Sequence, residues 1–328
     1  MNSTVPPIPS KRFVSSFLYG KTGARDWSAE SPYDGFFDFI SPSADRYRIL
    51  LGQIEKLKLN SAVISIKGNR HFFIFPSVRN STLPAKGALP SFKGQSPIIL
   101  TAHYDRVPDS PGANDNSAAV FHLLKAAQRL RELREVNWII IFTDKEELRA
   151  GDAIQDQGSF SLAEKLRAWG LGGGRIFNFD VCGSGDTFII SSTTDYLLKK
   201  ISQREARKTK QQIDKLREHA LNTARHLRLN KVLLVPTPFS DDAGFLRAGI
   251  PAQTITMLPS VEASSYAAIL RSRPNFADCL ISGTAQSKIN PRLIPETWRT
   301  INGPSDSYLR LTPQFFDRVV RFAVALCR

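Results

Sequence analysis

Four short motifs along the middle of this 328-residue chain contain acidic residues, and the first of them also contains a histidine. In order they are His103-Tyr104-Asp105, residues 112–116 (GANDN), Glu146-Glu147 and Asn178-Phe179-Asp180. Carboxylates gathered in one cleft would repel one another and stay partly protonated unless a cation were present. With a histidine among them, a divalent ion of the zinc type is the expected partner. The motifs therefore predict a metal site wherever the fold brings them together.

The adjacent glutamates indicate what such a site would do. Two neighbouring side chains cannot both point at one ion, so one can hold metal while the other accepts a proton from a water molecule activated by the metal. This division of work is typical of a hydrolase. Any one of these motifs alone is more often structural, so the prediction depends on their occurring together.

Apolar segments that predict buried strands lead into three of the motifs, at residues 96–102, 136–143 and 175–179. Segments with helical spacing alternate with them, at residues 117–133 and 160–169. This alternation predicts an α/β fold with a mixed, largely parallel central sheet flanked by helices on both faces. Ligands of such sheets bind at the carboxyl ends of the strands, so motifs distant in sequence can converge there.

The remaining segments extend this pattern within one expected domain, residues 1–328. Further elements are expected as a hairpin at 61–76, strands at 187–192, 231–235 and 252–257, and helices at 43–59, 195–228, 241–248 and 312–326. Residues 1–35, rich in Pro, Ser and Gly, are expected to wrap the surface. Residues 259–297 show no clear periodicity and are expected to form an insertion near the site.

The motifs together resemble the co-catalytic zinc exopeptidases, a family that includes bacterial leucyl aminopeptidase and, with one zinc ion, the glutaminyl cyclases. The family pattern is H-x-D, G-A-x-D-[ND], E-E, N-x-D, S-D-H-x-x-F before G-I-P, and a terminal H-T-x-x-D. This chain has TAHYD, GANDNSA, DKEEL, FNFDVCG, FSDDAGFLRAGIPA and INGPSD, in the same order over residues 97–328. The resemblance implies the zinc exopeptidase fold.

The resemblance also implies a role for each matching residue. It makes Glu146 the general base and Asp105 the carboxylate that orients the His103 ring. It places a cis peptide bond between Asp115 and Asn116. The metal ligands that it implies are His103, Asp115 and Asp180 for one ion, with Asp115 bridging to a second ion held by Glu147.

Two positions depart from the family pattern. Asn302 stands where the terminal histidine ligand is expected, although Asp306, its companion, is present. An amide oxygen is a neutral, weak ligand, so one zinc ion is expected rather than two. Asp242 replaces the histidine of S-D-H, a position implied, with Phe245, to contact the substrate. Because the cyclases hold their zinc at the subsite of Asn302, cyclase activity is not expected.

The net charge of +14 is concentrated between Arg204 and Lys231. A solvated helix face explains it most simply, and the alternative is a site for an acidic partner, nucleic acid included. No aromatic residue occurs from Ile201 to Lys231, which argues against single-stranded nucleic acid.

Three cysteines without C-x-x-C spacing argue against a disulfide framework. No run reaches the ~20 apolar residues of a membrane span, so a cytoplasmic protein is expected. The expected function is a metal-dependent hydrolase, an aminopeptidase acting on a peptide or small amide substrate. The alternative is a non-catalytic homologue that serves as a binding or scaffold protein, because a fold alone does not imply an activity.

Overall fold

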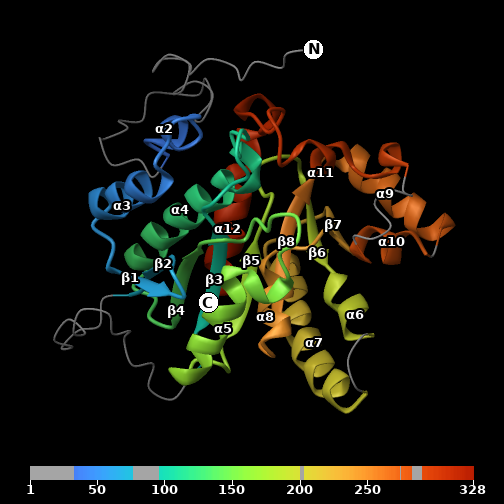
Figure 1. Cartoon of the computed structure of the whole chain (residues 1–328), viewed down its shortest axis with the longest axis horizontal. Coiled ribbons are helices and arrows are strands. Elements are labelled where there is room, and N and C mark those ends of the chain that lie inside the picture. Colours follow the sequence, from blue (N-terminus) through green and yellow to red (C-terminus); the bar gives the residue numbers. More distant parts are fainter. Residues whose placement is uncertain (1–32, 77–95, 200–202, 274, 283–289) are drawn as a thin grey trace.

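The computed structural model describes residues 33–76, 96–199, 203–273, 275–282 and 290–328. Eight strands form one sheet at its centre (Figure 1). Their bounds are β1 Ser61–Ile66, β2 Asn69–Ile74, β3 Ile98–His103, β4 Trp138–Thr143, β5 Arg175–Phe179, β6 Thr187–Ser191, β7 Val232–Val235 and β8 Ala252–Leu258.

The order of the strands across the sheet is β1-β2-β4-β3-β5-β8-β6-β7. The central strands β4, β3, β5 and β8 run parallel to one another. On either side β2 pairs antiparallel with β4, and β6 pairs antiparallel with β8. The predicted mixed, largely parallel sheet is therefore confirmed.

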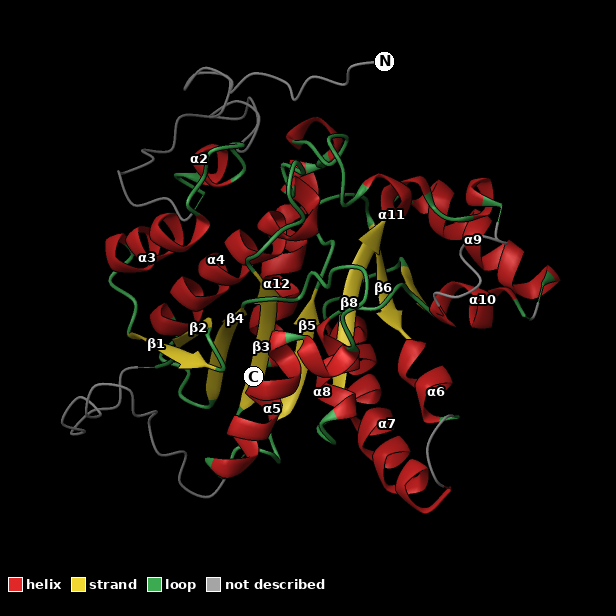
Figure 2. Ribbon diagram, viewed as in Figure 1, coloured by secondary structure: helices red, strands yellow, loops and turns green. Residues whose placement is uncertain are grey.

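Helices cover both faces of this sheet, as Figure 2 shows. Their bounds are α2 Phe36–Phe39, α3 Arg46–Lys56, α4 Ala118–Glu132, α5 Gly158–Ala168, α6 Thr193–Leu198, α7 Gln203–His226, α8 Asp241–Arg247, α9 Ser260–Ser272, α10 Phe276–Ser282, α11 Glu296–Thr300 and α12 Phe316–Leu326. Of the described helices, none is both long and apolar enough to cross a membrane.

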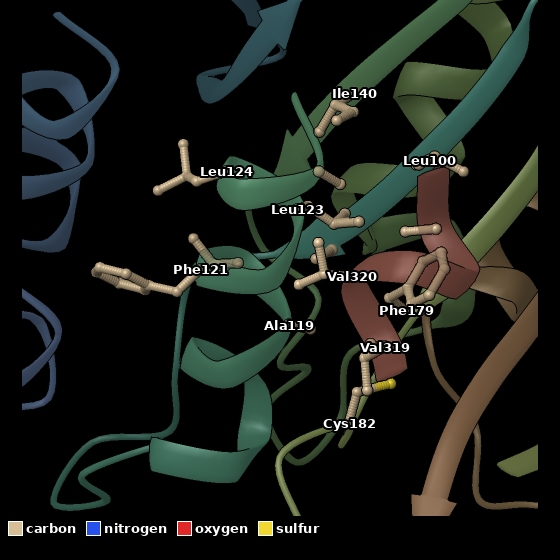
Figure 3. Packing of buried hydrophobic residues seen from close by; sticks show 14 of the residues in the cluster. Leu100, Ala119, Phe121, Leu123, Leu124, Ile140, Phe179, Cys182, Val319 and Val320 are labelled. Carbon is tan, nitrogen blue, oxygen red and sulfur yellow. The ribbon is translucent and has the colours of Figure 1, made fainter. Parts of the chain in front are cut away.

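The two faces of the sheet carry separate apolar clusters because successive strand side chains point to opposite sides. Leu100 and Ile140 belong to the cluster with α4 and α12. The neighbouring Ile99 and Ile141 belong to the cluster with α5 and α8. Figure 3 shows the first cluster, where α4 packs against Val320 of α12. The central strands are thus buried on both sides, as their continuous apolar sequences predict.

The hairpin of β1 and β2 is confirmed, with Ile66 paired to Asn69. Its two turn residues, Lys67 and Gly68, have φ angles of 50° and 88°. Positive φ at both positions belongs to the two-residue turn whose twist matches that of the flanking strands.

The single helix expected over residues 195–228 is wrong, because α6 ends at Leu198 and α7 begins at Gln203. Asp195 of α6 forms an ion pair of 3.1 Å with Arg217 of α7. In one straight helix these residues would lie about 33 Å apart, at a rise of ~1.5 Å per residue. The ion pair therefore requires the chain to reverse between the two helices.

The segment 259–297 contains α9, α10 and the start of α11 in its described part. Its apolar side chains, including Tyr266 and Phe276, form a third cluster with Val181 and Leu258. Val181 follows Asp180 directly in the chain. The role of the segment as an insertion near the site stays a prediction. The segment predicted at residues 1–35 lies outside the described residues, apart from 33–35.

Candidate metal centre

The carboxyl ends of three adjacent parallel strands bring the predicted site residues together. His103 is the last residue of β3, and Asp180 follows the last residue of β5. Glu146 comes three residues after the end of β4. Since β3 lies between β4 and β5, the three side chains meet at one edge of the sheet.

The His103 ring is buried among three carboxylates. Its Nε2 atom lies 2.9 Å from Asp115 Oδ1 and 3.5 Å from Asp180 Oδ1, and its Nδ1 atom lies 3.4 Å from Asp105 Oδ1. Among the described residues, neither ring nitrogen forms a hydrogen bond of good geometry. Asp180 Oδ1 is also buried without a hydrogen-bond partner there.

The glutamate pair lies within ligand distance of the same ring. One candidate ligand group contains His103, Asp115 and Asp180, and a second contains His103, Glu146 and Glu147. Within each group the ligand atoms all lie within 4.8 Å of one another. The Asp105 carboxylate accepts hydrogen bonds from the backbone N–H groups of Glu146, at 3.2 Å, and Glu147, at 3.1 Å. Asp105 thus contacts His103 and also holds the backbone of the loop that carries Glu146 and Glu147.

The pKa values of these groups show how strongly the carboxylates interact. Burial and the charges of Asp115, Asp105 and Asp180 raise the pKa of Glu147 to about 9. Burial and neighbouring carboxylates raise the pKa of Glu146 well above its usual value. Burial opposes the charged form of His103, yet the carboxylates raise its pKa well above 6.5. The carboxyl groups around His103 therefore carry more negative charge than the histidine can balance.

These residues fit a divalent metal ion of the zinc type. Histidine nitrogen and carboxylate oxygen are ordinary zinc ligands. The unpartnered His103 Nε2 and Asp180 Oδ1 atoms face the same small region as Asp115. A cation there would satisfy them and relieve the repulsion among the carboxylates. His103, Asp115 and Asp180 are the residues that would hold it.

The loop that carries Asp115 is fixed by polar contacts that the sequence motifs do not reveal. The Asp306 carboxylate accepts hydrogen bonds from the N–H groups of Asn114, at 2.8 Å, and Asp115, at 3.0 Å. The Asn116 side chain donates to the Phe179 carbonyl and accepts from the Val181 N–H, on either side of Asp180. The peptide bond between Asp115 and Asn116 is cis, as the resemblance implies.

A second polar contact, also missed by sequence reasoning, orients Glu146. The Gln157 amide donates hydrogen bonds to Glu146 Oε1, at 3.2 Å, and to the Glu146 carbonyl, at 3.3 Å. The Ser159 hydroxyl donates to the side-chain oxygen Oε1 of Gln157 at 3.3 Å. No spacing rule links residues 146 and 157, so only the folded structure reveals this contact.

The two residues expected to contact substrate are both buried. Asp242 is 1% exposed, and burial raises its pKa to about 7. Phe245 is 0% exposed and belongs to the apolar cluster of Ile99 and Leu162. Their contact with substrate stays a prediction, while the described surroundings of Phe245 are those of a core residue.

Asn302 lies in the loop before Asp306 and is exposed, with a φ angle of 63°. The next carbonyl, of Gly303, accepts a hydrogen bond of 3.2 Å from Ser110 Oγ. Within the described chain, the Asn302 side chain forms no hydrogen bond to Glu147 or Asp115. Its assignment as a weak or lost ligand therefore stays a prediction.

Gly158→Ala is expected to disturb the glutamate loop. A Cβ atom at Gly158 would lie 1.8 Å from the Asp144 carbonyl oxygen, so the backbone before Glu146 must move. Overpacking of this kind typically costs about 1–3 kcal/mol of unfolding free energy, and we expect zinc affinity to fall with it. Denaturant unfolding and a zinc titration measure both effects.

The matched control is Gly52→Ala in α3, where a Cβ atom would meet no other atom within 4 Å. Alanine is favoured over glycine inside a helix by up to about 1 kcal/mol. This variant should therefore gain stability and bind zinc unchanged. Equal behaviour of the two variants would contradict the close contact at Gly158.

The basic helix α7 borders a cavity of about 1100 Å³ together with α12 and the end of α4. Two of the arginines that line it are paired, Arg129 with Asp317 at 2.7 Å and Arg328 with Glu135 at 3.1 Å. The lining thus carries less free positive charge than its composition suggests. An acidic or nucleic-acid partner for this helix stays a prediction.

Comparisons with known proteins identify a sequence family and a shared fold. The sequence model of Peptidase family M28 matches residues 87–297. The LapA aminopeptidase of Legionella pneumophila has a TM-score of 0.56 at 15% identity, covering 100% of this chain and 74% of that chain. The glutaminyl cyclase of Porphyromonas gingivalis has a TM-score of 0.53 at 15% identity, covering 92% of this chain and 97% of that chain.

A zinc aminopeptidase from Bacillus subtilis has a TM-score of 0.46 at 18% identity, covering 78% of this chain and 48% of that chain. The chain thus spans about half the length of that protein. No curated protein sequence matches this chain. At such identities the structural likenesses establish the fold, which aminopeptidases and a cyclase share.

Proposed function

Because the chain belongs to peptidase family M28, we propose that it is a metal-dependent hydrolase that removes the N-terminal residue from peptides. The observation that carries the proposal is the group of His103, Asp115 and Asp180 at the strand ends. A glutamate pair lies within reach of the same histidine. Zinc is the proposed cofactor, with one ion bound rather than two.

When bound, zinc supplies a Lewis acid that polarises the substrate carbonyl and lowers the pKa of a water molecule from 15.7 toward ~7. His103, Asp115 and Asp180 would hold this ion. Asp105 would keep the His103 ring in place through the contact at Nδ1. The carboxylates in the crevice would also attract the positively charged N-terminus of a peptide.

Glu146 is the proposed general base. Its carboxylate accepts a hydrogen bond from Gln157 at Oε1, which leaves the second carboxylate oxygen for the proton of the attacking water. Burial and neighbouring charges raise its pKa well above the usual value. A cation nearby would lower this pKa again toward the working pH, where a base is most effective.

The test is turnover by the zinc-loaded protein on a panel of aminoacyl amides and short peptides. The proposal predicts release of the N-terminal residue and no release from peptides whose α-amine is acetylated. Cyclisation of N-terminal glutamine, assayed in parallel, is not expected. Zinc bound in stoichiometric amount without any turnover would instead favour the alternative, a binding or scaffold protein. A cytoplasmic location remains part of the proposal.

Asn302→His is expected to raise the zinc content from one ion to two per chain. The proposal makes position 302 the site of a missing imidazole ligand, beside Glu147 and Asp115. Elemental analysis after dialysis measures the change, and Asn302→Ala serves as the control that adds no ligand. An unchanged content of one ion in Asn302→His would mean that position 302 does not face the second subsite.

A further inference from the structure

Arg46 is a buried arginine that belongs to none of the sequence motifs. It is the first residue of α3 and is only 6% exposed. Its guanidinium group faces the loop of residues 104–117, which leads from the end of β3 to α4 and carries Asp105 and Asp115. Burying an arginine is costly unless its donors are satisfied, so its partners indicate what it does.

The partners of Arg46 are mostly backbone carbonyls of that loop. Its hydrogen bonds reach Tyr104 O at 3.1 Å, Asp105 O at 2.9 Å, Pro111 O at 2.9 Å, Gly112 O at 3.1 Å, Ser117 Oγ at 2.7 Å and Phe39 O at 3.3 Å. One rigid, planar group thus ties the start of the loop to the turn that precedes Asp115.

The 104–117 loop leaves room for the Arg46 guanidinium group at Gly112. Gly112 has a φ angle of 59°, and a Cβ atom there would lie 2.6 Å from Arg46 Nη2. Burial and the charge of Arg106 lower the pKa of Arg46 to about 9, while the carboxylates of Asp105, Asp306 and Asp115 favour its charged form. Arg46 therefore places a positive charge behind an acidic loop as well as fixing the backbone of that loop.

We propose that Arg46 is a positioning residue of the metal centre. By holding the 104–117 loop, it keeps the carboxylates of Asp105 and Asp115 directed at the His103 ring. It is placed to act through these two residues, since all its hydrogen bonds are to backbone carbonyls and Ser117. The inference rests on the proposed function in taking the centre to bind zinc, and it does not require turnover.

The test compares Arg46→Met and Arg46→Lys with the control Arg106→Met. Arg106 donates to the carbonyls of Ser41 and Pro42, at 2.9 Å each, and more weakly to Ile40 and Pro111. It forms no hydrogen bond to Asp105 or Gly112. The measurements are zinc affinity by chelator competition and hydrogen exchange of the metal-free protein.

Arg46→Met is expected to weaken zinc binding about 10–100-fold, the usual effect of losing a group that orients a ligand. Arg46→Lys should fall between it and the wild type, because an ammonium group offers three donors where guanidinium offers five. Exchange should rise in the 104–117 loop and stay unchanged in β3 and β4. Arg106→Met should bind zinc as the wild type does.

Unchanged zinc affinity in Arg46→Met, or an equal loss in Arg106→Met, would overturn the inference. Faster exchange throughout β3 and β4 would do the same, because it would show a general structural role. Should Arg46→Met fail to fold, Ser117→Ala removes one Arg46 acceptor and must still weaken zinc binding. An inactive wild type with these zinc effects would refute only the proposed hydrolysis.

Discussion

Glu146→Gln is expected to reduce turnover by about 10²–10⁴-fold, the usual contribution of a general base. The amide keeps the size of the side chain and removes its ability to accept a proton. Zinc content should stay unchanged, because the proposed ligands of the bound ion are His103, Asp115 and Asp180. Turnover by zinc-loaded protein and elemental analysis of the same sample measure the two quantities.

The charge-matched control is Glu164→Gln in α5. Glu164 lies on the surface and forms an ion pair of 3.2 Å with Lys67, so its loss should leave turnover unchanged. The structure also allows a different result for Glu146, because it belongs to a ligand group with His103 and Glu147. Loss of zinc in Glu146→Gln would make Glu146 a ligand and remove it from the role of base.

The sequence predicts the part of the site that lies at strand ends. A strand that is apolar throughout and ends in a polar residue specifies both the burial of the strand and the place of that residue. His103 ends such a strand and Asp180 follows one, and the order of β4, β3 and β5 then brings them together. The α/β fold and the hairpin were predictable for the same reason, since periodicity and turn residues are local properties.

The residues that hold the site residues in position were not predictable in this way. Arg46, Gln157 and Asp306 act through hydrogen bonds to loops that are distant in sequence. An arginine that begins a helix is ordinarily exposed, and nothing local to Arg46 distinguishes it from Arg48, which is exposed. The reversal between α6 and α7 was missed likewise, because the contact that reveals it joins residues distant in sequence.

Metal-free protein is expected to lose stability as the pH rises from 6 to 8. Burial raises the pKa of Asp242 and of Asp306 from 3.8 to about 7, and that of Glu147 from 4.5 to about 9. A carboxyl whose pKa is higher in the folded state binds its proton more tightly there. Its contribution is therefore present at low pH and is lost as the pH rises through the folded pKa.

Two buried histidines oppose this trend. Burial lowers the pKa of His71 to about 4 and that of His122 to about 3, so both favour the folded state increasingly as the pH rises past 6.5. Between pH 6 and 8 each contributes about 1 kcal/mol by linkage. The three carboxyls together lose roughly 5 kcal/mol on the same reasoning. The carboxyls outweigh the histidines, and the net change is a loss.

Zinc is expected to oppose this pH dependence. A bound cation favours the ionised form of its ligands, and its affinity rises with pH as they lose their protons. Since a ligand that binds only the folded state stabilises it, the rise in melting temperature on adding zinc should be larger at pH 8 than at pH 6. Calorimetric melting of metal-free and zinc-loaded protein at both pH values measures this difference.

Asp242→Asn removes one buried carboxyl with a raised pKa and leaves the candidate metal ligands in place. Asp242 is in neither candidate ligand group, so the variant should keep its zinc while the metal-free protein loses less stability between pH 6 and 8. A metal-free wild type that is more stable at pH 8 than at pH 6 would refute the excess of buried negative charge. Zinc would then have to bind for reasons other than relief of that charge.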